Sequence, residues 1–182
     1  MCGDTINNNL FLELSEKEEE LFLLIVNTGF YINHYSKISS ISNYTVRLLV
    51  NKGLIIKGRS HFIFTKYFNV YILSDYGKEY ALRRYLLYPY IFRDRNIEHD
   101  YVLGRIYLSL SKKESKSWIN EGTLIRRYPN TVVIDGMFTD AYDRAVGIEV
   151  ITSNYSENDI FKKMDFIKKY CDKDIIVYTK NL

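Results

Sequence analysis

The sequence has few cysteines and prolines, and it has no long apolar segment. Its 182 residues include two Cys and two Pro. Cys2 and Cys171 lie near opposite ends of the chain, so they form neither a metal-binding spacing nor a disulfide framework. No apolar run approaches the ~20 residues that span a bilayer, and the short run 21–26 follows acidic residues, unlike a signal peptide. We therefore expect a cytoplasmic protein with no membrane partner.

The sequence also lacks a glycine-rich phosphate-binding loop and a group of neighbouring histidines. The three histidines are His34, His61 and His99, and their separation leads us to interpret them as surface or packing residues rather than metal ligands. The length suffices for one medium domain or two small ones, and 47% of the residues are hydrophobic, which is enough for a core.

The net charge of +3 conceals an uneven distribution along the chain. Residues 1–30 carry a net charge of −5, residues 31–95 carry +8, and residues 96–182 are neutral. The middle segment holds eleven Lys and Arg against three Asp and Glu. Such a concentration of positive charge favours a polyanionic partner.

The segment 41–56 predicts a short helix followed directly by a strand. Ser42 suits the N-cap, because its hydroxyl can accept a bond from a free helix amide, and Gly53 suits the left-handed C-terminal position. The apolar stripe comprises Val46, Leu49 and Val50. The opposite face carries Asn43, Tyr44, Arg47, Asn51 and Lys52. This pattern is typical of a helix that reads the DNA major groove, although an ordinary amphipathic helix with a solvated face shares it.

The elements around this segment are predicted to be helical before it and a β-hairpin after it. We expect helices over 16–27 and 32–39, strands over 54–64 and 68–73, and a helix over 75–86. Over about residues 15–86, this order and the strings TVRLLVNKGLI and VYILSDYGKEYA resemble the winged helix-turn-helix class. The resemblance implies that the third helix enters the major groove and that the hairpin, or wing, contacts the DNA backbone or minor groove.

The resemblance assigns DNA contacts to both elements. The helix residues are Ser42, Asn43, Tyr44, Thr45, Arg47 and Lys52, and the wing residues are Lys57, Arg59, His61 and Lys66. An arginine can bind guanine through two hydrogen bonds, an asparagine can bind adenine, and each phosphate contact adds about one unit to the salt dependence. A winged helix that binds another protein is the alternative.

The second half of the chain predicts a mixed α/β arrangement. We expect a helix over 98–110, a lysine-rich loop, a short strand over 117–120, strands over 132–138 and 145–151, a helix over 158–170, and a strand over 174–179. The last strand–helix–strand unit should cross over right-handedly. The predicted fold is thus α+β, with a winged helix domain in residues 1–90 and a small α/β domain in residues 91–182.

Two acidic residues, Asp135 and Glu149, fall in neighbouring predicted strands, with a helix after the second. This arrangement resembles the restriction-endonuclease-like fold, in which such acids hold a divalent metal and a lysine two residues after the second acid helps to activate water. Glu98 or Asp100 could provide a further acid. Here the lysine position is Ile151, so we interpret the site as degenerate and expect no catalysis and no metal.

Two other interpretations of these acids stay open. The following helix could supply the missing ammonium through Lys162, Lys163 or Lys168, and the chain would then be an Mg²⁺-dependent DNA nuclease that uses Asp135 and Glu149. Alternatively the acids are structural, with the aspartate at a turn and the glutamate paired with a basic neighbour.

A broader resemblance covers about residues 15–179. It is to the plasmid replication-relaxation family, and it rests on His99, Asp100, Trp118, Glu121, Asp135, Gly136, Glu149 and Tyr170. The chain departs at Ile134, where the family usually has proline, and at Ile151, where a second acid often follows. The resemblance implies a plasmid or mobile-element protein that supports replication, relaxation or conjugative transfer.

We therefore predict a sequence-specific protein that binds double-stranded DNA through its winged helix. The α/β domain would support homodimerisation, a second DNA contact, or binding of a relaxase or replication protein. The alternatives are the metal-dependent nuclease and a winged helix transcriptional repressor.

Overall fold

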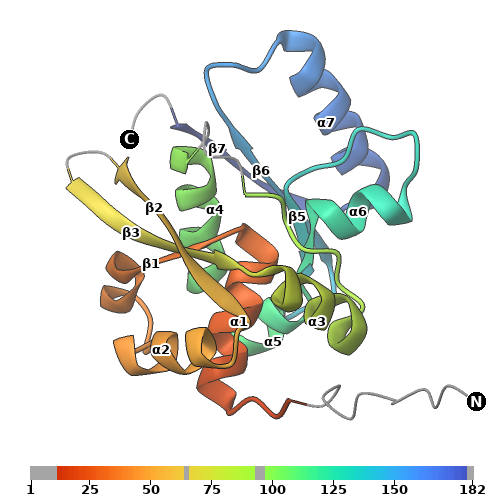
Figure 1. Ribbon diagram of the computed structural model, residues 1–182. Coiled ribbons are helices and arrows are strands. Elements are labelled where there is room, and N and C mark those ends of the chain that lie inside the picture. Colours follow the sequence, from red (N-terminus) through yellow and green to blue (C-terminus); the bar gives the residue numbers. More distant parts are fainter. Residues whose placement is uncertain (1–11, 64–65, 93–96, 180–182) are drawn as a thin grey trace, which may run out of the picture.

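The computed structural model describes residues 12–63, 66–92 and 97–179, which form helices and two β-sheets (Figure 1). The N-terminal half contains α1 (Glu16–Thr28), β1 (Tyr31–Ile32), the 3₁₀ helix η2 (Asn33–Lys37), α2 (Asn43–Asn51), β2 (Ile55–Ile63), β3 (Lys66–Leu73) and α3 (Asp75–Tyr85). The C-terminal half contains α4 (Ile97–Ser109), α5 (Lys112–Lys116), β4 (Ile119–Asn120), α6 (Glu121–Arg127), β5 (Gly136–Thr139), β6 (Ala145–Ile151), α7 (Glu157–Tyr170) and β7 (Lys173–Tyr178). The predicted α+β class is confirmed.

The first sheet is antiparallel, with the strand order β1-β3-β2. Its two long strands form the predicted hairpin, in which Ile55 pairs with Leu73 and Ile63 pairs with Lys66. The register shifts between Lys57 and Ser60, which marks a bulge in β2. Ile55 and Ile63 at the two ends of β2, and Val70 and Leu73 of β3, are buried against the protein, whereas most of β2 between its ends is exposed.

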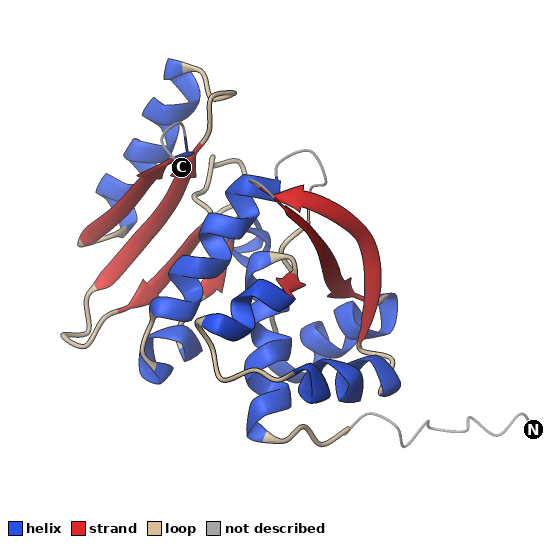
Figure 2. Ribbon diagram, turned by 90° about the vertical axis from the view of Figure 1, so that its left-hand side faces the viewer, coloured by secondary structure: helices blue, strands red, loops and turns tan. Residues whose placement is uncertain are grey.

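The second sheet has the order β4-β5-β6-β7. The first two strand pairs are antiparallel, whereas β6 and β7 are parallel and are joined through α7. The predicted strand–helix–strand unit is therefore confirmed, and β6 coincides with the predicted range. Both α4 and α7 contact β6 and lie on opposite sides of it (Figures 1 and 2). This double cover explains why six consecutive residues of β6, Val146–Ile151, are buried.

One hydrophobic core extends through both halves of the chain. It joins Phe22 and Ile25 of α1 to Leu103 of α4 and Ile148 of β6. A buried hydrogen bond also joins the two halves of the chain, because the side-chain amide of Asn120 donates to the carbonyl oxygen of Val26 over 3.0 Å. A smaller cluster lies beneath α6 and α7. The shared core crosses the boundary predicted near residue 90, and the division into two domains stays a prediction.

Several predicted elements differ from the observed ones. The second helix is the 3₁₀ turn η2, α5 occupies the expected lysine-rich loop, and α6 follows where no helix was predicted. Side-chain caps explain the last two, because Ser111 and Glu114 form a capping box and Asn120 caps α6. Within the described ranges, none of the helices combines the length and apolar character needed to cross a bilayer.

The strand that contains Asp135 is also shorter than predicted. It begins only at Gly136, so the placement of Asp135 in the middle of a strand is wrong. The carbonyl oxygen of Asp135 instead accepts a 2.9 Å hydrogen bond from the amide of Glu121, the first residue of α6. Asp135 thus lies at the point where the chain enters β5.

Candidate functional site

Five ionisable side chains are buried together between α4, the second sheet and α7. His99 and Asp100 belong to α4, Asp135 precedes β5, Glu149 lies in β6, and Lys163 lies in α7. Their exposed fractions range from 0% to 7%. Groups of this kind are rarely buried unless they are paired. We name these five residues the acid–base cluster.

Lys163 connects Asp135 and Glu149, the two acids selected in the sequence analysis. Its Nζ atom lies 2.8 Å from Oε1 of Glu149 and 3.9 Å from Oδ1 of Asp135. The backbone amide of Asp135 also donates to Oε2 of Glu149 over 3.2 Å. Of the three lysines considered from the sequence, α7 thus directs Lys163 into the cluster, whereas Lys162 and Lys168 are exposed.

His99 attaches α4 to the other side of Asp135. Its Nε2 atom lies 3.0 Å from Oδ2 of Asp135, and its Nδ1 atom lies 2.9 Å from Oδ1 of Asp100. The hydroxyl of Tyr90 donates to the same Asp100 oxygen over 2.8 Å, and the Val150 amide donates to Oδ2 of Asp135 over 2.7 Å. A chain of polar contacts therefore runs from the segment before α4 to β6.

The charges of the cluster shift the pKa values of its members. Burial opposes the charge on His99, but the negative charge of Asp135 and hydrogen bonds to Asp100 and Asp135 outweigh it and raise the His99 pKa to about 10. The Asp135 pKa is lowered, because the charge of His99 overcomes the effect of burial. Burial and the nearby Asp135 raise the Glu149 pKa to about 7, despite Lys163. The cluster therefore holds at least two cationic groups at neutral pH.

The cluster, as placed, does not fit a bound divalent cation. Two cationic side chains, His99 and Lys163, already contact the carboxylates of Asp135 and Glu149, and all four groups are buried. Throughout the described part of the chain, no set of three His, Cys, Asp or Glu side chains has an arrangement that could hold a metal ion. In this arrangement the site can link elements and hold protons, and a metal would have to displace Lys163 or His99.

The sequence analysis did not identify His99 or Lys163 as a site residue from the residues around it. Lys163 was one of three possible lysines, and His99 entered only through the family resemblance. His99 was interpreted as a surface or packing residue, whereas it is 2% exposed and contacts two acids. A signal for Lys163 existed, because it precedes the buried Phe166 and Ile167 by three and four positions and so shares their face of α7. A lysine within an apolar stripe needs a buried partner, and Glu149 is that partner.

The residues predicted to contact DNA from α2 divide into two groups. Asn43, Tyr44 and Arg47 are exposed, as is the N-cap Ser42, whose hydroxyl accepts a bond from the Thr45 amide. Thr45 itself is 6% exposed, so its side chain faces the protein rather than a partner. The exposed polar face that the sequence predicted for this helix is thus present around Asn43, Tyr44 and Arg47.

Lys52, after the end of α2, is engaged within the protein. Its Nζ atom lies 2.6 Å from Oε1 of Glu18 and donates to the carbonyl oxygen of Glu13 over 3.0 Å. Glu18 also forms the capping box of α1 with Ser15. The Lys52 charge is therefore neutralised by α1, and we leave it out of the proposed DNA contacts.

The hairpin residues predicted to contact DNA are mostly exposed. Lys57, Arg59 and Lys66 face solvent, whereas His61 is half-buried and its ring packs edge-on against Phe92, with centroids 5.8 Å apart. The hairpin and α2 lie on the same side of the molecule, at the left of Figure 1. The structure thus brings the two predicted DNA-contacting elements onto one side.

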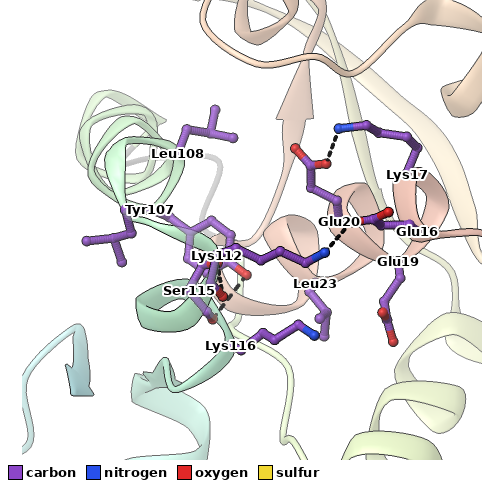
Figure 3. A pocket seen from close by; sticks show the side chains of 11 residues that line it. Glu16, Lys17, Glu19, Glu20, Leu23, Tyr107, Leu108, Lys112, Ser115 and Lys116 are labelled. Carbon is purple, nitrogen blue, oxygen red and sulfur yellow. Dashed lines mark hydrogen bonds and ion pairs between the residues drawn. The ribbon is translucent and has the colours of Figure 1, made fainter. Parts of the chain in front are cut away.

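A separate pocket is lined by residues around α1, α4 and α5 (Figure 3), and none of the acid–base cluster residues lines it. Its volume is about 300 Å³, and charged side chains surround its opening. Many of these charges are already paired, since Lys112 binds Glu16 and Lys17 binds Glu20. Because these exposed charges are paired with each other, they do not indicate which ligand the pocket would bind, and we assign no function to it.

The residues that carry the plasmid-protein resemblance are partly gathered in space. His99, Asp100, Asp135 and Glu149 share the acid–base cluster, and this proximity is independent of the resemblance. The resemblance itself stays a prediction. Comparison of the chain with protein-family models, curated proteins and solved structures gave no match.

Proposed function

We propose that this protein binds double-stranded DNA, with α2 as the reading helix and the β2–β3 hairpin as the wing of a winged helix-turn-helix. The order α1–β1–η2–α2–β2–β3–α3 supports this assignment, with η2 in place of the second helix. The net charge of +8 over residues 31–95 provides the attraction to phosphate.

The exposed polar face of α2 is the observation that carries the proposal. Val46 and Leu49 hold the helix in the core, with exposed fractions of 3% and 0%. Tyr44 is 62% exposed on the other side, and Arg47 has no ion-pair partner among the residues that the structure describes. A rigidly held helix with free hydrogen-bonding side chains meets the requirements of major-groove reading.

We further propose that the C-terminal part is a degenerate relative of the restriction-endonuclease-like fold. A sheet with an acid at the entry to one strand, an acid in the next strand and a following helix supports this view. In the proposed role, the acid–base cluster fixes α4 to the sheet rather than cutting DNA. A plasmid role in replication, relaxation or conjugative transfer, as a homodimer or with a relaxase or replication protein, rests on the family resemblance.

A titration of labelled duplex DNA with the whole protein tests the proposal. We expect binding that weakens steeply with salt, that is weaker in Arg47→Ala, and that is unchanged in Arg127→Ala. Arg127 is a suitable control because it is an exposed arginine on α6, on the right of Figure 1. Absence of binding at low salt, or equal binding by Arg47→Ala, would contradict the assignment of α2.

One observation favours a second candidate function, a metal-dependent DNA nuclease. Lys163 contacts Glu149 and lies near Asp135, and so supplies the ammonium that is missing at Ile151. Incubation of supercoiled plasmid with the protein, with and without Mg²⁺ or Mn²⁺, separates the two functions. Nicking that needs the metal and disappears in Glu149→Gln would establish the nuclease, whereas intact plasmid under all conditions would leave the DNA-binding proposal alone.

A further inference from the structure

The outer face of the β2–β3 hairpin carries an exposed aromatic pair. Phe62 lies directly opposite Tyr67 in the antiparallel register, and their rings meet edge-to-face with centroids 5.2 Å apart. The side chains are 54% and 75% exposed. Two exposed rings in contact with each other form a small apolar surface, and its burial by a partner would be favourable.

The inner face of the same hairpin explains why these rings are not needed for folding. Ile63 is 1% exposed, the ring of Phe68 packs against His34, and the ring of His61 packs against Phe92. These contacts anchor the hairpin to the protein from one side. Since side chains alternate along a strand, Phe62 and Tyr67 are held on the other side in a fixed position.

The hairpin that carries the aromatic pair is basic. Arg59 is exposed and lies in the bulge of β2, and Lys66 is exposed next to Tyr67, although its pairing with Ile63 directs it to the other face of the strand. The sequences of β2 and β3 contain no Asp or Glu. A partner for this face should therefore combine negative charge with flat, apolar surfaces, and nucleic acid bases on a phosphate backbone have both properties.

We propose that Phe62 and Tyr67 bind unpaired or unstacked DNA bases, so that the protein prefers DNA with a locally opened segment to a continuous duplex. This inference rests on the proposed DNA-binding function and names its substrate more closely. In the proposed complex α2 holds the adjoining duplex, while the rings stack on exposed bases and Arg59 contacts a phosphate. Paired bases stay stacked within the helix and offer no face to these rings, which gives the preference its physical basis.

Three labelled DNA probes of equal length test this inference with the whole protein. One is a continuous duplex, the second has a central run of mismatched pairs, and the third is single-stranded. We expect tighter binding to the mismatched probe than to the duplex. Tyr67→Ala and Phe62→Ala should each weaken binding to the mismatched probe about tenfold, the size expected from loss of one stacked base, with little effect on the duplex.

Two control variants separate stacking from simple apolar contact. Tyr67→Phe keeps the ring and should keep the preference, whereas Ile56→Ala removes an exposed aliphatic side chain from β2, 47% exposed, and should not alter it. Unfolding midpoints within experimental error of wild type would show that the variants fold. Because neither ring is in the core, we expect all four variants to pass this check.

Each contrary outcome has a separate meaning. Equal affinity for duplex and mismatched probe, or a preference that survives Tyr67→Ala, overturns this inference and leaves the proposed duplex-binding function intact. Failure to bind any probe at low salt overturns both. A loss of self-association in Phe62→Ala, measured by light scattering, with DNA binding unchanged would assign the aromatic pair to a contact between copies of the chain and overturn its role with bases.

Discussion

The ammonium of Lys163 lies 2.8 Å from a carboxylate oxygen of Glu149, although the two residues come from a helix and a strand and are 14 positions apart. Both side chains are almost fully withdrawn from water. Removal of one partner from such a pair leaves the other charge buried without compensation, which is usually more costly than loss of the whole pair. This relationship makes the cluster a measurable part of the stability of the protein.

Lys163→Met should destabilise the protein. The variant keeps the length and apolar character of the side chain but removes its charge, so Glu149 loses its ammonium partner. Because the Glu149 pKa is already about 7, the carboxyl can take up a proton instead of staying charged, and we expect a loss of about 1–3 kcal/mol. Urea unfolding followed by the fluorescence of Trp118, the single tryptophan, measures it. Exposed Lys162 provides the matched control, since Lys162→Met should change the free energy of unfolding by less than about 0.5 kcal/mol. Equal midpoints for the two variants would show that the pair contributes nothing.

The contact between His99 and Asp135 should make stability fall as the pH rises above neutrality. The His99 pKa is raised from 6.5 to about 10, so between these values the folded protein retains a proton that the unfolded chain has lost. The stabilisation is complete below pH 6.5 and is lost as the pH rises through 10. We expect the advantage of wild type over His99→Gln to be larger at pH 7 than at pH 9.5 in urea unfolding.

A second histidine provides the control for this pH effect. Burial and the neighbouring charges of Lys37 and Arg105 lower the His34 pKa, so that residue titrates below pH 6.5 and outside the window. His34→Gln should therefore differ from wild type by the same amount at pH 7 and pH 9.5. If His99→Gln behaves in the same way, the proton is not held by the contact with Asp135.

Local patterns in the sequence predicted most of the helices and strands. The helix predicted from residue 16 begins there, after a capping box formed by Ser15 and Glu18, and β6 has its predicted range, because helix caps and runs of apolar residues depend on near neighbours. The strand that begins at Gly136 was predicted too long, because residues 132–134 are apolar, but the carbonyl oxygen of Asp135 bonds to the amide of Glu121 in α6 and not to a strand. The cap of α6, Asn120, was not recognised as a helix start.

The acid–base cluster was harder to predict because its members come from distant parts of the chain. Asp135 and Glu149 could be selected, since two acids in apolar strands are unusual. Which lysine meets them depends on the rotation of α7 against the sheet. The spacing of Lys163 to Phe166 and Ile167 was a signal that was not used, and the structure shows the contact of Lys163 and leaves Lys162 exposed. His99 reaches Asp135 because α4 packs on β6, and no local pattern contains that contact.

Gly136 should not tolerate a side chain. A Cβ atom at this position would lie 2.3 Å from Cζ2 of Trp118, whose ring is 2% exposed and parallel to that of Phe138. Gly136→Ala forces the indole to move within a packed core, and we expect a loss of about 1–3 kcal/mol in urea unfolding. Gly58→Ala is the control, since its nearest neighbour would lie at an ordinary 3.6 Å. A midpoint for Gly136→Ala equal to that control would mean that the indole has room to shift.

Replacement of Arg47 by alanine should reduce both the affinity for DNA and the dependence of that affinity on salt. An arginine that contacts a phosphate releases about one counterion, so Arg47→Ala should lower the slope of log affinity against log salt by about one unit. If Arg47 instead binds a guanine edge, its removal should cost about 1–3 kcal/mol of binding free energy on the preferred sequence and little on other sequences. Anisotropy titrations over a range of salt, with a preferred and an unrelated duplex, distinguish these roles. The exposed Arg127 on α6 carries the same charge and is the control. If Arg47→Ala and Arg127→Ala have identical slopes and identical affinities on both duplexes, α2 does not lie at the DNA, and the hairpin alone would have to account for binding.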